Sequence, residues 1–474
     1  MSSSIGRLEL AFSVAFSCIL LSIFGVGLAL TPGAYSKTAH KYCGYKILGQ
    51  AGILGQTFIY LTALMPAGLS QMKPILMVLA TFGWLVFAFN SFRIYRQLRP
   101  YQRNAFSTFK FILVLFLVMG FTVKILGEPI SSWDARSIWF FHGKMLYYAN
   151  PDSLLNVSWL HPSVAFSHAD YPKLVATTSA WAASIIGTWN EYLPKTSILV
   201  LTLTATFLLF SLARNFTQLI GWLFLILLNI GNLLWVGLMD GYLAVFASLA
   251  LWYTWRGLED NQGDQLLTGG VIALFLCQIK NEGQLFLAIF LVVIFPLSLL
   301  QYKKLQQHTS RWALWPLFLT LATTFVWKNF IRANEIKNDL FQDSSAIANK
   351  LITRLTDGSL SVISGFVAEK SVFYQTILGS LFILTGLSVY AHKKNRVLLA
   401  SQKAKIIIAF AALGACYTIG ITSIYLLTPH DLVWHLETSL SRTILIPVWV
   451  LNTINLIILT EGEYQVIARP NHGI

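Results

Sequence analysis

Charge is scarce in this chain of 474 residues: only 11% of them are charged, against about a quarter in a soluble domain. Hydrophobic residues make up 55%, and apolar runs long enough to span a bilayer recur almost end to end. So few polar residues could not cover so much apolar surface in water, which excludes a water-soluble fold. The sequence therefore predicts an all-α fold: a polytopic transmembrane helical bundle of about 13 membrane helices, with a large extracytoplasmic loop carrying interfacial helices.

Cysteine is also scarce, with four residues and no CxxC spacing. This argues against a disulfide framework or a zinc site, and it favours free buried thiols. The first apolar run starts near Leu8 and is too long for the core of a signal peptide, so we expect it to remain as a helix.

The formal net charge of +14 lies mainly in three segments that contain almost no acid. No basic patch is interleaved with aromatics that could stack on bases, so we expect no nucleic-acid partner. Excess Lys and Arg in the loops of a membrane protein instead indicates the cytoplasmic side. The three clusters are Arg93, Arg96, Arg99, Arg103 and Lys110; Lys303, Lys304 and Arg311; and Lys393, Lys394, Arg396, Lys403 and Lys405.

Placing these clusters inside assigns three polar segments, 128–172, 332–371 and 428–440, to the extracytoplasmic side. Run 173–188 must then be a partial or re-entrant element, because an odd number of crossings is needed before residue 301. We divide the chain into N-terminal membrane helices (1–108), a central membrane core that includes the outer segment 128–172 (109–300), and C-terminal membrane helices (301–474). The apolar runs are 9–31, 47–70, 74–92, 109–127, 173–188, 197–213, 218–236, 241–257, 266–280, 283–300, 312–331, 372–390, 405–427 and 440–460.

The first outer segment reads "EPISSWDARSIWFFHGKMLYY" and concentrates ionisable groups among aromatics. Ser131 or Ser132 can cap a helix here, and Arg136 and Lys144 would share one of its faces. Aromatic residues suit a helix that lies in the membrane interface. Asp134 and Arg136 are therefore either ordinary solvated charges or part of a site.

Three later motifs place charges at the predicted outer ends of apolar runs. "HADYPKL" holds His168 and Asp170, where the acid either serves a site or caps the helix after Pro172. "LMDGYLAVF" holds Asp240, either a functional acid or an Asp-Gly turn. "CQIKNEGQLF" places Lys280 and Glu282 within an apolar stretch, which favours function over a short hairpin.

The last motif, "TPHDLVWHLETSLSRTIL", predicts a helix that Pro429 can start. Asp431, His435, Thr438 and Arg442 then share one stripe, which is typical of an anion clamp or of a charged rim. The predicted topology puts all five polar groups on the outer face. One shared site explains that distribution better than five independent accidents.

In the order of these motifs the chain, over roughly residues 109–460, resembles the GT-C superfamily of polytopic glycosyltransferases, such as protein O-mannosyltransferases and lipid A aminoarabinose transferases. The resemblance implies that Asp134 is the catalytic base and that Asp240 is a second catalytic acid, as a partner of metal or acceptor. It places Lys280 and Arg442, with His435, at the donor phosphate. The positions expected to support the acceptor or the site are Asp170, His168, Glu282, Arg136 and Asp431.

The resemblance implies an inverting, hexosyltransferase-type enzyme of the bacterial plasma membrane. It would move a sugar from a polyprenyl-phosphate donor to a lipid, glycan or protein acceptor. It leaves room for a divalent metal, Mg²⁺ or Mn²⁺, but Asp134 is followed by Ala135 and no Asp-x-Asp occurs, so no metal ligand is assigned.

A secondary transporter, a lipid-linked glycan flippase or ligase, and an accessory membrane subunit stay open as alternatives. Transporters place ionisable groups near the midplane and often show repeated halves. Here the groups gather at one predicted face and no internal repeat is visible.

Overall fold

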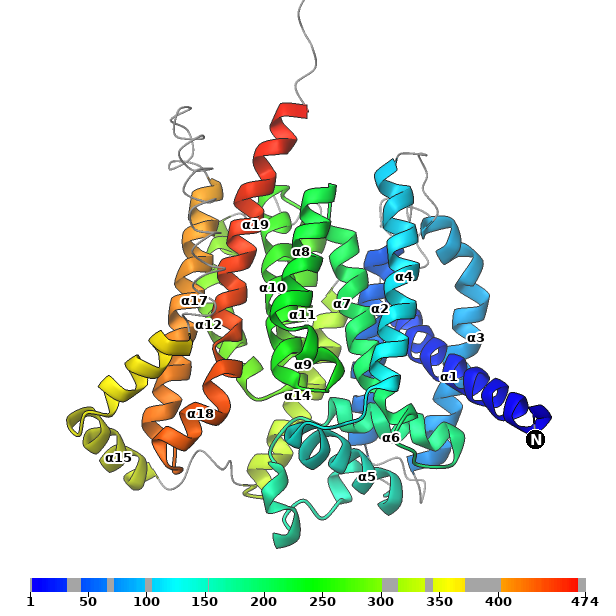
Figure 1. The fold of residues 1–474 in the computed structure, drawn as a ribbon, viewed down its shortest axis with the longest axis horizontal. Helices are drawn as coiled ribbons and strands as arrows, with labels where there is room; N and C mark the ends of the chain where they lie inside the picture. The colour runs from blue at the N-terminus through cyan, green and yellow to red at the C-terminus, as the bar shows by residue number, and fades with distance from the viewer. Residues whose placement is uncertain are drawn as a thin grey trace, which may run out of the picture.

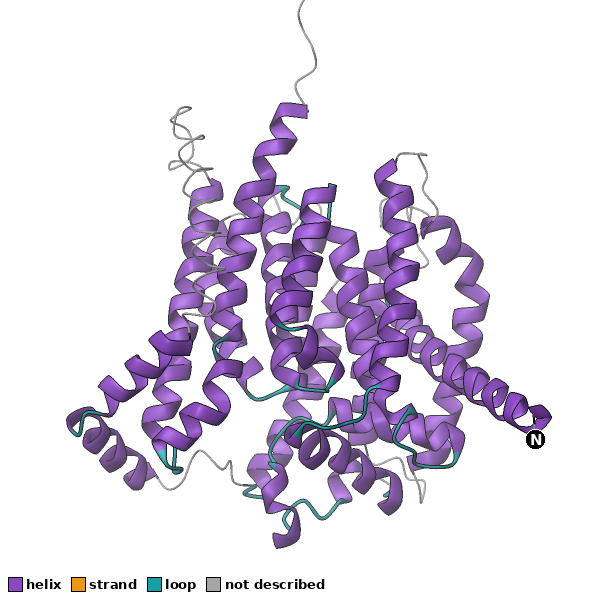
Figure 2. Cartoon of the chain, in the orientation of Figure 1, coloured by secondary structure: helices purple, strands orange, loops and turns teal. Residues whose placement is uncertain are grey.

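The computed structural model describes residues 2–31, 44–65, 72–98, 105–151, 153–300, 314–336, 344–370 and 402–467. Every regular element in these ranges is helical, which confirms the all-α prediction for the described part of the chain (Figure 2). Most of the long helices run side by side in one bundle, and α1 crosses its right-hand side obliquely (Figure 1). They are α1 (Ser2–Leu30), α2 (Gly44–Leu64), α3 (Met72–Leu98), α4 (Ala105–Gly127), α7 (Thr196–Leu212), α8 (Phe216–Asn229), α10 (Met239–Glu259), α11 (Gly263–Ile279), α12 (Glu282–Leu300), α14 (Trp315–Ala333), α17 (Gln402–Leu427) and α19 (Leu445–Ile467).

The shorter helices gather at the lower end of the bundle in Figure 1. They are η2 (Ala135–Trp139), α5 (Phe140–Ala149), η3 (Leu154–Asn156), η4 (Pro162–Ser167), α6 (Leu174–Ile186), η5 (Leu193–Lys195), α9 (Gly231–Trp235), α15 (Ser344–Thr356), a helix over 359–370, and α18 (Leu432–Thr443).

A helix lies over each predicted apolar run except 372–390, which falls outside the described residues. Seven candidate spans in the described chain are long and apolar enough to cross a membrane. The run 173–188, expected to be a partial element, holds only the 13-residue helix α6, about 20 Å long at 1.5 Å per residue and so too short to span. By length and composition, the seven candidate spans are those of a helical membrane protein.

Polar contacts join helix termini at both ends of the bundle. At the upper end, Arg214 pairs with Asp260 at 2.6 Å and Lys403 with Glu259 at 2.6 Å. At the lower end, the ammonium of Lys195, the last residue of η5, donates to the Leu126 carbonyl near the end of α4. The described helix ends that flank the basic segments lie at the upper end, opposite α5, α6 and α18 (Figure 1).

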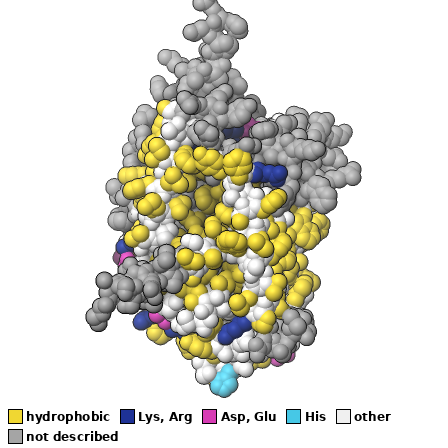
Figure 3. All heavy atoms as spheres, turned by 90° about the vertical axis from the view of Figure 1, so that its right-hand side faces the viewer, with side chains coloured by type: hydrophobic (Ala, Val, Ile, Leu, Met, Phe, Trp, Pro, Cys, Tyr) yellow, Lys and Arg dark blue, Asp and Glu magenta, His cyan; other side chains and the backbone are white. Residues whose placement is uncertain are grey.

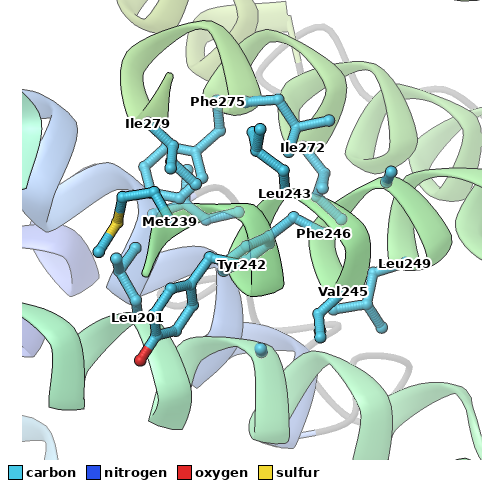
Figure 4. Packing of buried hydrophobic residues seen from close by; sticks show 14 of the residues in the cluster. Leu201, Met239, Tyr242, Leu243, Val245, Phe246, Leu249, Ile272, Phe275 and Ile279 are labelled. Carbon is cyan, nitrogen blue, oxygen red and sulfur yellow. The ribbon is translucent and has the colours of Figure 1, made fainter. Parts of the chain in front are cut away.

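Helix α10 forms the centre of the core. Its residues from Met239 to Leu258 are buried, as expected for a helix that is apolar on nearly all sides. Phe246 packs edge-on against Phe275 of α11 with ring centroids 5.4 Å apart, and on another side Tyr242 approaches Leu201 of α7 (Figure 4). This packing fixes the first turn of α10 at the lower end.

Large apolar side chains cover the outer faces of α3 and α4, and an apolar surface is visible on that side (Figure 3). On α4 the exposed residues Ile112, Phe116, Met119 and Val123 form one stripe. An apolar stripe of this kind is disfavoured in water and suits contact with lipid.

Glycines allow α1 to pack closely against α2 and α3. A Cβ added to Gly27 would collide with the carbonyl oxygen of Ala51 in α2, and one added to Gly25 would collide with the carbonyl of Gly83 in α3. Small residues at such contacts let helix backbones approach each other within a membrane.

We expect Gly27→Val to lower the free energy of unfolding by about 1–3 kcal/mol, because the added side chain must push α1 away from α2. Thermal unfolding in detergent measures this effect. Gly120→Val is the matched control, because a Cβ there meets no atom within 4 Å. Equal unfolding temperatures for the two variants would contradict the packing of α1.

Candidate functional site

A cavity of about 860 Å³ opens at the lower end of the bundle. We call it the central cavity. Its wall combines the segment around η2, the loop before α6, the start of α10, the corner between α11 and α12, the end of α17, and α18. The acidic, basic and histidine residues that line it are Asp134, His168, Asp240, Lys280, Glu282, Lys328, His430, His435 and Arg442.

Five of these residues form a chain of alternating charge. The Arg442 guanidinium lies 2.6 Å from Asp134 and 3.7 Å from Asp240. The Lys280 ammonium lies 2.8 Å from Asp240 and 2.8 Å from Glu282. Residues up to 308 positions apart in sequence therefore meet in one ionic network.

Asp134 is held by an irregular helix. The helix begins at Trp133 and takes a π-helical turn over Ala135–Trp139 before α5 continues it. Such turns are rare and often occur at functional sites. The Asp134 side chain is 22% exposed while that of Asp240 is 4% exposed, so Asp134 is the acid more open to a second reactant.

Helix ends hold the buried pair Asp240 and Lys280. Asp240 lies in the first turn of α10, not in the Asp-Gly turn that the sequence left open, and Lys280 follows the last residue of α11. Partial charges at helix ends favour an acid at the N-terminus and a base at the C-terminus. Although burial disfavours the charged ammonium, the Asp240 and Glu282 carboxylates hold the pKa of Lys280 well above its usual range.

A second polar group lies beside this chain. Asn281 donates to the Asp170 carboxylate at 2.6 Å and accepts from the Lys328 ammonium at 2.9 Å. Tyr171 stacks between the rings of Trp139 and His168, with centroids 5.6 Å and 4.9 Å away. Asp170 therefore anchors the loop before α6 to the α11–α12 corner and does not cap α6.

The structure separates the predicted site residues into two sets. Asp134, Asp240, Lys280, Arg442, His435, His168 and Glu282 line the central cavity, and Asp170 reaches it through Asn281. Arg136 and Asp431 do not line it. Arg136 lies on another cavity, because the segment around η2 presents it away from Asp134. Asp431 instead accepts from the Trp434 N–H at 2.9 Å and caps α18.

Two cavity residues escaped the sequence analysis. Asn281 lies between Lys280 and Glu282 but carries no charge, so the pattern of charged residues does not indicate it. Lys328 interrupts the apolar run 312–331 in "FVWKNF", and an intramembrane lysine is itself a signal for function.

The residues present do not fit a divalent metal. Asp134 and Asp240 each lie beside a cation, and among the described residues no group of three or more His, Cys, Asp or Glu could hold a metal ion. Hard cations require several convergent oxygen ligands. We therefore assign no role to a divalent metal.

A buried cluster supports the loop before α6. The ring of His142 contacts the Ser167 hydroxyl at 2.9 Å and the Lys173 ammonium nitrogen at 3.1 Å. Lys173 also lies 4.3 Å from the centre of the Trp159 ring. Burial, followed by the Lys173 charge, lowers the pKa of His142 well below its usual range. His142 is therefore neutral in the folded protein at neutral pH.

We expect this burial to make the protein less stable in mild acid. Below about pH 6.5 the unfolded chain binds a proton at His142 that the folded protein does not, so stability falls as the pH drops toward 5. His142→Gln should flatten the fall in unfolding temperature between pH 7 and pH 5. The exposed His161, changed to Gln, is the control and should leave the slope as in the wild type. Identical slopes for all three proteins would exclude His142 as the cause.

Comparison of the chain with protein-family models, with curated proteins and with solved structures finds no match.

Proposed function

We propose that the protein is a membrane glycosyltransferase that moves a sugar from a polyprenyl-phosphate donor to an acceptor at the extracytoplasmic surface. The observation that carries the proposal is the convergence of Asp134, Asp240, Lys280 and Arg442 on one cavity at one end of the bundle. Two cations and a partly exposed carboxylate are what cleavage of a sugar–phosphate bond needs.

The lower end of the bundle would face the outside of a bacterial plasma membrane. This follows from the positive-inside rule, because the described helix ends at the three basic segments lie at the upper end. About 13 crossings, with 128–172 as the large outer loop, would complete this topology.

Lys280 and Arg442 would bind the donor phosphate. When the sugar–phosphate bond breaks, positive charge develops on the sugar and negative charge on the phosphate. Ammonium and guanidinium groups stabilise that developing anion, and a site with little water strengthens the effect. Buried Lys280 is held in place by Asp240 and Glu282, so it needs little reorganisation.

Asp134 would take the proton of the acceptor hydroxyl as the acceptor attacks from the face opposite the phosphate, which inverts the anomeric centre. In the unliganded protein Asp134 is paired with Arg442 at 2.6 Å. A donor phosphate competes for the same guanidinium, so donor binding would release the Asp134 carboxylate. Binding of the first substrate would thereby activate the base for the second.

The apolar part of the central cavity suits a lipid tail. Leu285 of α12 and Gly420, Ile421 and Ile424 of α17 line it beside the ionic chain. A Cβ at Gly420 would come within 2.9 Å of the Leu285 side chain, so α12 and α17 approach each other closely where they form this apolar wall. A polyprenyl chain would lie along this apolar wall of α12 and α17, with its phosphate at Lys280 and Arg442.

Purified protein incubated with a panel of labelled polyprenyl-phosphate sugars tests the proposal. We expect one donor to be consumed, with release of polyprenyl phosphate and labelled sugar on water or acceptor. A transporter or flippase would move a lipid-linked sugar across vesicles without breaking this bond. Intact donors throughout the panel, together with donor movement in proteoliposomes, would replace the enzyme proposal by transport.

A further inference from the structure

A second cavity, of about 390 Å³, lies at the lower end of α4. We call it the lateral cavity. It is lined by the end of α4, the segment that follows, one face of η2 and α5, and the segment that leads into α7. It shares no lining residue with the central cavity. Asp134 and Arg136 are only two positions apart in sequence, but Asp134 lines the central cavity and Arg136 the lateral one.

The wall of the lateral cavity is mainly cationic, with Arg136, Lys144 and Lys195 against one acid, Glu191. Lys195 is buried, and its ammonium donates to the carbonyls of Leu126 at 2.6 Å and Glu128 at 2.5 Å. Two of its three N–H donors are thus used, which leaves one for a ligand.

The other two cations, Arg136 and Lys144, are accessible to an anion. No hydrogen bond or ion pair ties the Arg136 side chain to another residue that the structure describes, and this side chain is exposed. Lys144 pairs with Glu191 at 2.9 Å, but both side chains are substantially exposed, at 43% and 60%. An ion pair so exposed contributes little, so a phosphate can displace it.

A lipid-facing surface leads into this cavity. The exposed apolar stripe of α4 passes through Phe116, Met119 and Val123, and four residues further on it reaches Gly127, which lines the cavity. Positions four apart lie on one side of a helix. Acyl chains packed along this stripe would therefore place a headgroup directly at Arg136 and Lys144.

We propose that the lateral cavity binds the phosphate headgroup of an anionic phospholipid, whose acyl chains lie along α4. Arg136 would contact the phosphate through its paired N–H groups, and Lys144 and Lys195 would add point charges. Basic pockets beside membrane helices bind anionic headgroups in this way. This site is independent of the sugar-transfer proposal.

Lipid binding to purified full-length protein, followed by native mass spectrometry, tests the proposal. The probes are phosphatidylglycerol, phosphatidylcholine and inorganic phosphate. We expect phosphatidylglycerol to bind more tightly than phosphatidylcholine. The double variant R136Q/K144Q should bind phosphatidylglycerol roughly 30-fold more weakly, because each charge near the membrane surface contributes about one kcal/mol to the binding free energy.

Two controls make the result decisive. R136K/K144R keeps both charges and should retain most of the binding. Arg332→Gln removes an exposed charge at the end of α14, away from the lateral cavity, and should bind as the wild type does. Unchanged binding by R136Q/K144Q, or equal affinity for the two phospholipids, would overturn the proposal. If inorganic phosphate bound as tightly as phosphatidylglycerol, the proposed contact of the acyl chains with α4 would be wrong.

Discussion

Asp134→Asn is expected to abolish sugar transfer while the protein folds as before and binds donor at least as tightly, because Asp134 no longer competes for Arg442. A positioned general base contributes on the order of 100- to 10,000-fold to a rate, and an amide cannot accept the acceptor's proton. Because Asp134 and Arg442 are partly exposed, at 22% and 24%, loss of their ion pair should have little effect on stability. The measurement is the transfer rate at saturating donor, beside the unfolding temperature.

Glu437→Gln provides the matched control for this variant. Glu437 is an exposed carboxylate on α18, the helix that carries Arg442, and it does not line the central cavity. It undergoes the same chemical change at the same end of the bundle, and we expect its transfer rate to equal that of the wild type. If Asp134→Asn transferred sugar as fast as Glu437→Gln, Asp134 would not be the general base.

Lys280→Met should have the largest effect on stability, with a loss of about 3–5 kcal/mol in the free energy of unfolding. Lys280 is 7% exposed and is the cation between Asp240 and Glu282, at 2.8 Å from each. Removing one partner of a buried ion pair leaves an uncompensated charge in a medium of low dielectric constant. The unfolding temperature in detergent reports this loss.

The triple variant Lys280→Met with Asp240→Asn and Glu282→Gln separates stability from function. It removes the buried negative charges as well, so we expect most of the lost stability to return. Transfer should stay absent, because no cation then faces the donor phosphate at this position. Recovery of transfer together with stability would show that Lys280 serves the fold alone. Lys280→Met with a wild-type unfolding temperature would contradict the buried ion pair itself.

Much of the architecture could be predicted from the sequence because hydrophobic runs are a strong local signal. Helices lie over the predicted runs in the described chain, and the short run 173–188 is a short helix as expected. The polar motifs could be identified for the same reason, since charges such as Lys280 contrast sharply with an apolar background. Both signals are local in sequence.

The details of the candidate site could not be read in this way. The pairing of Asp134 with Arg442 depends on how α18 packs beside η2, which no local pattern records. Spacing placed Arg136 and Lys144 on one face, and both line the lateral cavity, but no local pattern records that this face turns away from Asp134. Asp240 has turn-like neighbours, yet packing of α10 in the core draws it into a helix.

An electron cryomicroscopy structure of the wild-type protein with bound polyprenyl phosphate tests the central claim most directly. The account predicts the phosphate within hydrogen-bond distance of both Lys280 and Arg442, with the lipid chain along the apolar wall of α12 and α17. It also predicts that Arg442 has turned from Asp134 toward the phosphate. A phosphate bound elsewhere, with Arg442 still paired to Asp134, would contradict it.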